Sequence, residues 1–192
     1  MKRSRDIRVV RTQTALLEAL ERLIQTKKLS GITITELCTE ADINRNTFYY
    51  HYNNIIEFLD EHKQIVLDEL NDITDVSTTH SKENLIEIFN VLKYHPHFLN
   101  ILISPNCDLD LFNDIFAIAS KKASFSLSKH EDDFTNKELL LCTYCNAGCN
   151  AVIRSWILNG MRETPEEIAD IIWESSKKGI FSLMFPNESF NY

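Results

Sequence analysis

Residues 33–52, TITELCTEADINRNTFYYHY, decide the fold class of this chain. Thr33 and Glu36 have the T-x-x-E spacing of a capping box, which predicts that a helix begins at Thr33. A tight turn should follow at residues 42–44, and Asn44 is a favourable N-cap for a second short helix. Two short helices joined by a tight turn are the layout of a helix-turn-helix.

The second helix of this motif carries polar and aromatic groups on its outer face. On a helical wheel Phe48 and Tyr52 point inward, whereas Asn46 and Tyr50 point to the opposite side. Such side chains suit a DNA major groove, where Asn can pair with adenine, Arg with guanine, and Tyr, Thr or His with phosphate. The alternative is an amphipathic helix whose tyrosines pack on a neighbour. The capping box, the turn and the basic flank together favour a DNA-reading helix.

The composition of the chain predicts an all-α protein. Its 192 residues are 44% apolar and include only four Gly and four Pro, and the apolar residues recur at spacings of three and four. We expect a three-helix head and a larger helical body, with about nine helices in total. The predicted helices cover residues 6–28, 33–41, 45–52, 54–73, 82–94, 97–103, 109–127, 135–159 and 165–184.

The charge is unevenly distributed. The net charge of −8 argues against a general polyanion binder. Residues 1–53 contain nine Lys or Arg against six Asp or Glu, whereas the rest of the chain contains eleven against 22. A basic head on an acidic body is expected when only the head meets phosphate.

Three of the five cysteines, Cys142, Cys145 and Cys149, share one face of a predicted helix. Cys142 and Cys149 would be about 10.5 Å apart along the axis, too far for thiolates that bind one zinc ion at about 2.3 Å each. We therefore expect no metal. Packing at a helix interface is the main interpretation, and a redox switch is the alternative. Five cysteines without an apolar leader predict free thiols in a cytoplasmic protein.

No pattern indicates catalysis. GxSxG, P-loop, GxGxxG and HExxH motifs are absent, so we expect no enzyme, no catalytic residues and no cofactor. His95 and His97 flank Pro96, and this segment is interpreted as a helix break. No apolar run approaches the roughly 20 residues of a membrane span, so we expect no membrane partner.

The helix-turn-helix segment resembles the DNA-binding head of the TetR family of bacterial transcriptional regulators. It fits the pattern T-x-x-x-[IL]-[AC]-x-x-A-x-[VI]-[SN]-x-x-T-x-Y-x-H-[FY] through Thr33, Leu37, Cys38, Ala41, Ile43, Asn44, Thr47, Tyr49, His51 and Tyr52. Residues 147–172, around a Trp-x-x-x-Gly and a Pro-Glu-Glu, are more weakly similar to the C-terminal regulatory domains of the same family.

The resemblance implies a homodimer that binds a pseudo-palindromic operator in double-stranded DNA, with one head on each half-site. Residues 1–53 would form the DNA-binding domain, 54–74 a connecting helix, and 75–192 the effector-binding and dimerisation domain. Positions 45, 46 and 50 would contact bases, and positions 49 and 51 would hold phosphate. The DNA-binding residues implied are Thr33, Thr35, Arg45, Asn46, Thr47, Tyr49, Tyr50 and His51.

The resemblance also implies a repressor that a small-molecule effector releases from DNA. Aromatic residues of the body are candidates for the effector site, although core packing would explain each of them equally well: Phe89, Tyr94, Phe98, Phe112, Phe116 and Tyr144. The last two helices should pair with those of a second copy in a four-helix bundle. The residues expected at that interface are Val152, Trp156, Ile168, Ile171, Ile172 and Phe181.

Three residues depart from the family pattern. Asp42 replaces the usual Gly of the turn, and Asp tolerates a left-handed conformation. Asn46 replaces a small or basic residue, which should change base preference rather than fold. Ile55 replaces a Lys that would contact phosphate, so we expect the backbone N–H groups of Asn53 and Asn54 to hold that phosphate. DNA binding should then be modest and sensitive to salt.

Two other functions remain open. One is a protein-interaction or co-activator module with the same fold and weak DNA affinity, which the acidic net charge and Ile55 favour. The other is a thiol-sensing regulator that responds to oxidants through Cys145.

Overall fold

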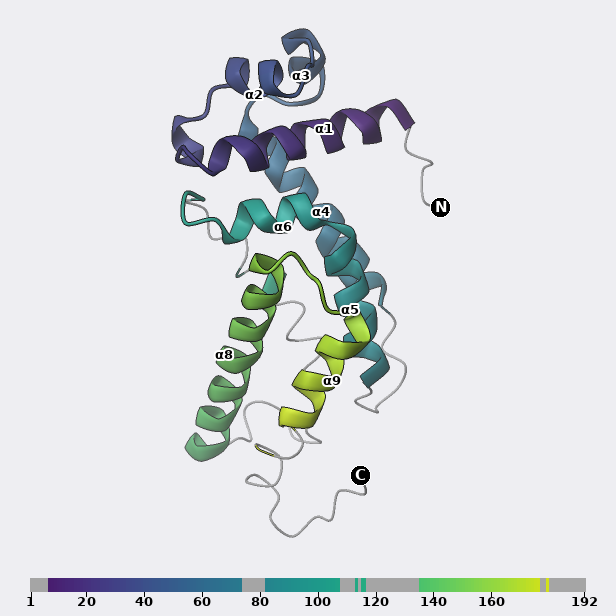
Figure 1. The fold of residues 1–192 in the computed structure, drawn as a ribbon, viewed down its shortest axis with the longest axis vertical. Helices are drawn as coiled ribbons and strands as arrows, with labels where there is room; N and C mark the ends of the chain where they lie inside the picture. Colours follow the sequence, from purple (N-terminus) through teal and green to yellow (C-terminus); the bar gives the residue numbers. More distant parts are fainter. Residues whose placement is uncertain are drawn as a thin grey trace. The chain divides into compact units, whose positions relative to one another are not determined.

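The structure is a computed structural model of the 192-residue chain, and it describes residues 7–73, 82–107, 113, 115–116, 135–176 and 179. These residues form helices and their connections, with no strand among them, so the predicted all-α class is confirmed (Figure 1). The helices are α1 (Ile7–Ile24), η1 (Leu29–Gly31), α2 (Ile34–Glu40), α3 (Arg45–His51), α4 (Ile55–Asp72), α5 (Lys82–Tyr94), α6 (Pro96–Ile103), α8 (Asn136–Leu158) and α9 (Pro165–Ser175).

Where the chain is described, most helix boundaries lie within two residues of the sequence expectations, but the helix expected over 6–28 ends at Ile24, before the short 3-10 helix η1. Thr33, Thr135 and Thr164 each start a helix with a complete capping box. Gly160 lies just beyond α8 with a φ of 78°, a left-handed conformation that glycine adopts at helix ends. Most of the helix expected over 109–127, and the end of the last one, lie outside the described residues.

The chain divides into two compact units, Met1–Val66 with His95–Asp114 and Leu67–Tyr94 with Ile115–Tyr192. The functional boundaries expected at residues 53 and 74 remain predictions.

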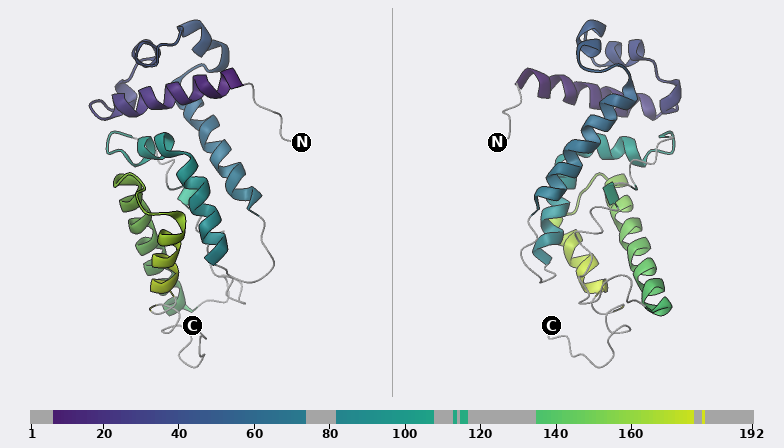
Figure 2. Two further views of the ribbon diagram at one scale, coloured as in Figure 1. Left: turned by 45° about the vertical axis from the view of Figure 1, so that its right-hand side comes forward. Right: turned by 180° about the vertical axis from the view of Figure 1, so that it is seen from behind.

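In the first unit, α1 lies between the α2–α3 pair and α6, as the views in Figures 1 and 2 agree. Leu16, Leu20 and Ile24 are fully buried on α1, at the spacing of four that marks one face of a helix. Arg22 of α1 forms an ion pair with Glu40 of α2 at 2.6 Å. The helix-turn-helix is therefore built onto one side of α1.

In the second unit, α9 packs along α5. Trp156 of α8 is buried against Phe89 of α5, with ring centroids 5.8 Å apart. Its indole N–H donates to the carbonyl oxygen of Glu163 at 3.1 Å, in the connection that leads into α9. An ion pair between Lys82 and Asp170 links α5 and α9.

Candidate nucleic-acid interface

Two buried aromatic residues orient α3. Phe48 and Tyr52 are both buried, with ring centroids 5.5 Å apart, and both contact Phe58 of α4. The hydroxyl of Tyr52 accepts a hydrogen bond from Nε2 of Gln13 at 2.8 Å, and the same nitrogen lies 3.0 Å from Oε1 of Glu61. This network joins α1, α4 and the end of α3, so it fixes which face of α3 points outward.

The outward face of α3 is the one expected from the wheel. All eight predicted DNA-binding residues are exposed. The two tyrosines are the most notable, because Tyr49 is 56% and Tyr50 83% exposed although both are large and largely apolar. Large exposed aromatic groups that cluster on a polar surface are a mark of an interaction site.

The turn before α3 has the geometry that its sequence predicts. Asp42 adopts a φ of 55°, in the left-handed region where the family pattern has Gly. Oδ1 of Asn44 accepts a hydrogen bond from the backbone N–H of Asn46 at 2.8 Å and so caps α3. The departure at position 42 therefore leaves the turn intact.

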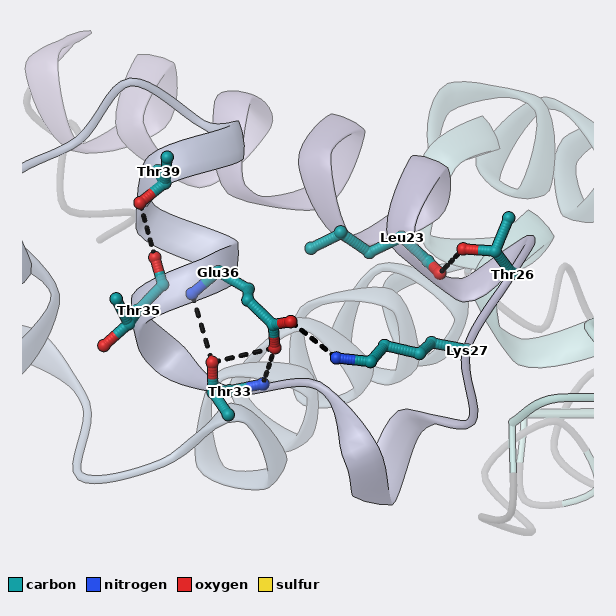
Figure 3. Close-up of polar contacts among 7 residues, drawn as sticks. All are labelled: Leu23, Thr26, Lys27, Thr33, Thr35, Glu36 and Thr39. Atoms are coloured by element: carbon teal, nitrogen blue, oxygen red, sulfur yellow. Dashed lines mark hydrogen bonds and ion pairs between the residues drawn. The ribbon is translucent and has the colours of Figure 1, made fainter.

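The start of α2 is held by a carboxylate (Figure 3). Oε2 of Glu36 accepts hydrogen bonds from the backbone N–H of Thr33 at 2.9 Å and from its hydroxyl at 2.8 Å. The Lys27 ammonium pairs with the other carboxylate oxygen. The hydrogen bond from Lys27, followed by those from Thr33, lowers the pKa of Glu36 from 4.5 to about 2. The hydroxyl of Thr33 is therefore engaged in capping its own helix.

Arg45 is already oriented by a neighbour on the other helix. Its Nη1 donates to the Thr35 hydroxyl at 3.3 Å, and both side chains are exposed. The contact brings together two residues that the sequence separates by ten positions. A guanidinium held in this way loses less conformational freedom when it binds.

The start of α4 corrects one expectation. Ile55, where the family pattern has Lys, is buried. The backbone N–H and side-chain amide of Asn53 both donate to Oε2 of Glu57 at 2.8 Å, while Oδ1 of Asn54 caps the N–H of Glu57 at 2.9 Å. The expectation that the Asn53 N–H would hold a phosphate was wrong, because the Glu57 carboxylate occupies it.

The predicted effector residues lie in different surroundings. Phe98 is buried in the first unit beside His62, with ring centroids 5.6 Å apart. Phe89 is buried in the second unit. The others are exposed or half-buried, namely Tyr94, Tyr144 and Phe116, while Phe112 lies outside the described residues. The effector site stays a prediction.

The predicted dimer residues also differ in how deeply they are buried. Trp156, Ile168 and Ile172 are buried within their own protomer. Val152 is half-buried, and Ile171 is exposed. Phe181 lies outside the described residues.

Sequence reasoning missed a cluster between α1 and α6. Nδ1 of His97 lies 2.6 Å from Oε2 of Glu21, and Nδ2 of Asn100 donates to the other oxygen of the same carboxylate at 2.7 Å. Asn106 adds a side-chain hydrogen bond to the carbonyl oxygen of Ile24 at 2.8 Å. No local pattern signals this contact, because residues 21 and 97 are far apart in the chain.

Within the described ranges, no group of three or more His, Cys, Asp or Glu is placed to hold a metal ion. Among the helices described, none is long and apolar enough to cross a membrane.

Comparison with known proteins identifies the family. A TetR-type family model described as "Transcriptional regulator C-terminal region" matches residues 79–178. An uncharacterized helix-turn-helix-type transcriptional regulator of Bacillus subtilis (strain 168), YxbF, is 34% identical over 105 residues, which are 50% of this chain and 28% of that protein. The chain thus spans less than a third of that relative's length.

The fold also matches a solved structure. The dihydroxyacetone kinase operon activator DhaS superposes with a TM-score of 0.55 at 23% identity, over 93% of this chain and 98% of its own. This likeness concerns the fold alone. The family match over residues 79–178 covers more than half of the 192 residues, and the chain belongs to the TetR family of transcriptional regulators.

Proposed function

We propose that the protein is a homodimeric, sequence-specific DNA-binding regulator, a repressor that a small-molecule effector releases from its operator. The observation that carries the proposal is the outer face of the α2–α3 pair. Its eight candidate residues are all exposed, and the buried side chains of Phe48 and Tyr52 fix the helix that bears most of them. The DNA and the regulator would meet in the cytoplasm.

The residue types on this face divide between bases and phosphates. Arg45, Asn46 and Tyr50 lie on the part of α3 that would enter a major groove, where guanidinium and amide groups can read guanine and adenine. Phosphate would be held by the exposed hydroxyls of Thr35, Thr47 and Tyr49 and by the exposed imidazole of His51. Thr33 would contribute by capping α2, since its hydroxyl is engaged with Glu36.

The outer face of α8 supports a homodimer. Exposed residues recur on it at spacings of four and three, as in a helix-pairing seam: Leu140, Tyr144, Ala147, Ala151, Arg154 and Leu158. Leu140, Tyr144 and Leu158 are 71%, 73% and 65% exposed. On a helical wheel this seam lies opposite Trp156 and Cys149, which face the protomer's own interior. A second copy would bury the seam and give an isologous interface.

The cluster between α1 and α6 is where an effector signal could enter the head. Glu21 ties α1 to His97 and Asn100, so a change in α6 would act directly on the helix that carries the helix-turn-helix. An effector that favours a second arrangement of the body would shift the population away from the DNA-binding form.

Selection of DNA fragments with the purified full-length protein tests the proposal. We expect one enriched pseudo-palindromic sequence, bound with an affinity that falls steeply as salt rises. Asn46→Ala and Tyr50→Ala should each weaken binding to that sequence by about 1–3 kcal/mol. In the absence of effector, Tyr94→Ala is a matched control, because Tyr94 is similarly exposed but lies on α5.

A second candidate function is a protein-interaction module with weak DNA affinity. It is favoured by the start of α4, where Ile55 is buried and the carboxylate of Glu57 occupies the Asn53 N–H. Under this alternative no fragment is enriched, and any DNA binding is independent of sequence.

A further inference from the structure

Two thiols and a hydroxyl meet where α8 faces the end of α9. Cys145 and Cys149 are one turn apart on α8 and are hydrogen-bonded to each other. Sγ of Cys145 also lies 3.5 Å from Oγ of Ser176, the C-cap residue of α9. Both cysteines are half-buried, and Ser176 is buried. The proposed function does not use these residues.

The two hydrogen-bond donors make Cys145 the more acidic member of the pair. The S–H of Cys149 and then the O–H of Ser176 stabilise the Cys145 thiolate and lower the pKa of Cys145, against the effect of burial. The same hydrogen bond, together with burial, raises the pKa of Cys149. Cys145 is thus the member of the pair that loses its proton more readily, and the thiolate is the nucleophilic form of cysteine.

The pKa of Cys38 shifts in the opposite direction to that of Cys145. Cys38 is buried, and burial raises the pKa of its thiol. Cys107 and Cys142 are half-buried, like Cys145 and Cys149. All five cysteines lie in the described residues, and none of them forms a disulfide.

Helix geometry disfavours a disulfide between the paired thiols. Side chains four positions apart on a helix have Cβ atoms about 5–6 Å apart. A disulfide needs Cβ atoms about 3.5–4.5 Å apart, so closing one here would distort α8. Chemistry that uses a single thiolate is therefore favoured over oxidation to a disulfide.

We propose that Cys145 is a covalent modification site for small α,β-unsaturated carbonyl compounds, with Cys149 as the neighbouring proton donor. The Cys145 sulfur forms a bond to the β-carbon, and the π electrons of the C=C bond move to the α-carbon. That carbon takes a proton from the Cys149 thiol, which is reprotonated from water. The product is a thioether, and no oxidant or reductant is consumed.

Cys145 is half-buried, so part of its side chain reaches solvent. Gly148, three positions along α8, is exposed. The adduct would displace the contact between Cys145 and Ser176, so it would act where α8 and α9 meet. The inference concerns this site and holds whether or not the α2–α3 face binds DNA.

Alkylation by N-ethylmaleimide, a small α,β-unsaturated carbonyl compound, tests the site on the full-length protein. Limiting reagent at pH 6, followed by peptide mass spectrometry, should place the first adduct on Cys145. The larger thiolate fraction, partly offset by lower intrinsic nucleophilicity, should make it react about ten-fold faster than Cys107. Cys145→Ser should remove the fast reaction, while Cys142→Ala on the same helix should leave it unchanged.

Substitutions of Cys149 and Ser176, the hydrogen-bond partners of Cys145, supply a second test. Cys149→Ala should slow the reaction of Cys145 at pH 6 and move its pH–rate profile toward that of an ordinary thiol near pH 8.5. Ser176→Ala should do the same to a smaller extent, and circular dichroism checks that each variant is folded. A first adduct on another cysteine, or a Cys145 rate that neither variant changes, would overturn the proposal.

Discussion

Gln13 shows how a single buried amide can determine the outer face of α3. Its Nε2 reaches both the Tyr52 hydroxyl and the Glu61 carboxylate. Gln13→Leu should leave these two groups without their donor and destabilise the first unit by about 1–3 kcal/mol. Urea unfolding measures this loss, and Gln25→Leu, at an exposed position just beyond the end of α1, should change little. Equal effects of the two substitutions would contradict the network.

Glu57 places a negative charge two residues from Ile55, the position at which the family pattern has a lysine. Because its carboxylate accepts both donors of Asn53, Glu57→Gln can keep these hydrogen bonds while it removes the charge. We expect the variant to bind the selected DNA several-fold more tightly at low salt, with the gain shrinking as salt screens it. Asp60→Asn, one turn further along α4, is the matched control. Unchanged affinity in Glu57→Gln would place this end of α4 away from DNA.

The pKa of Glu36 predicts a pH effect on the head. Since that pKa falls from 4.5 to about 2 on folding, the stabilisation is present above pH 4.5 and is lost as pH falls from 4.5 toward 2. Over this range the melting temperature of the wild-type protein should fall more than that of Glu36→Gln, which has no titrating group there. Parallel melting curves for the two proteins would show that the pairing with Lys27 does not stabilise the fold.

At the scale of the helices, local patterns were enough to predict the starts and the buried faces. The capping box at Thr33, the cap at Asn44 and the inward side of α3 depend on residues within about one turn of each other. The packing of α6 on α1 could not be predicted in this way. It depends on Glu21 meeting His97, and no spacing rule connects residues that only the tertiary fold brings together.

The contact between α1 and α6 predicts a matched pair of variants. Glu21→Ala should remove the acceptor of both His97 and Asn100 and lower the free energy of unfolding by about 1–3 kcal/mol. Glu18→Ala, on the same face of α1 but 3.6 Å from the His97 ring, should have a smaller effect. Hydrogen exchange should show faster opening of α6 in Glu21→Ala only. Similar exchange in both variants would mean that apolar packing alone holds α6.

At the scale of the whole molecule, the two apolar sides of α8 explain why a helical wheel alone could not identify the dimer residues on this helix. The helix is apolar on two opposite sides, and both sides satisfy the spacing of a buried face. The sequence expectation used the side that includes Val152 and Trp156, but the protomer itself buries Trp156. Only the packing of α5 and α9 shows which side remains exposed, and that information lies outside α8.

The exposed seam of α8 leads to a prediction about assembly. Leu140→Asp and Leu158→Asp each put a charge into the seam, and burying it against a second copy would be unfavourable. We expect the wild-type protein to sediment as a dimer and each variant to shift toward a monomer. Asn146→Asp adds the same charge on another exposed side of α8 and should leave the dimer intact. Because two linked heads bind a palindrome more tightly than one, both seam variants should lose affinity for the full operator while keeping that for a half-site. Seam variants that remain dimers would place the interface on another surface.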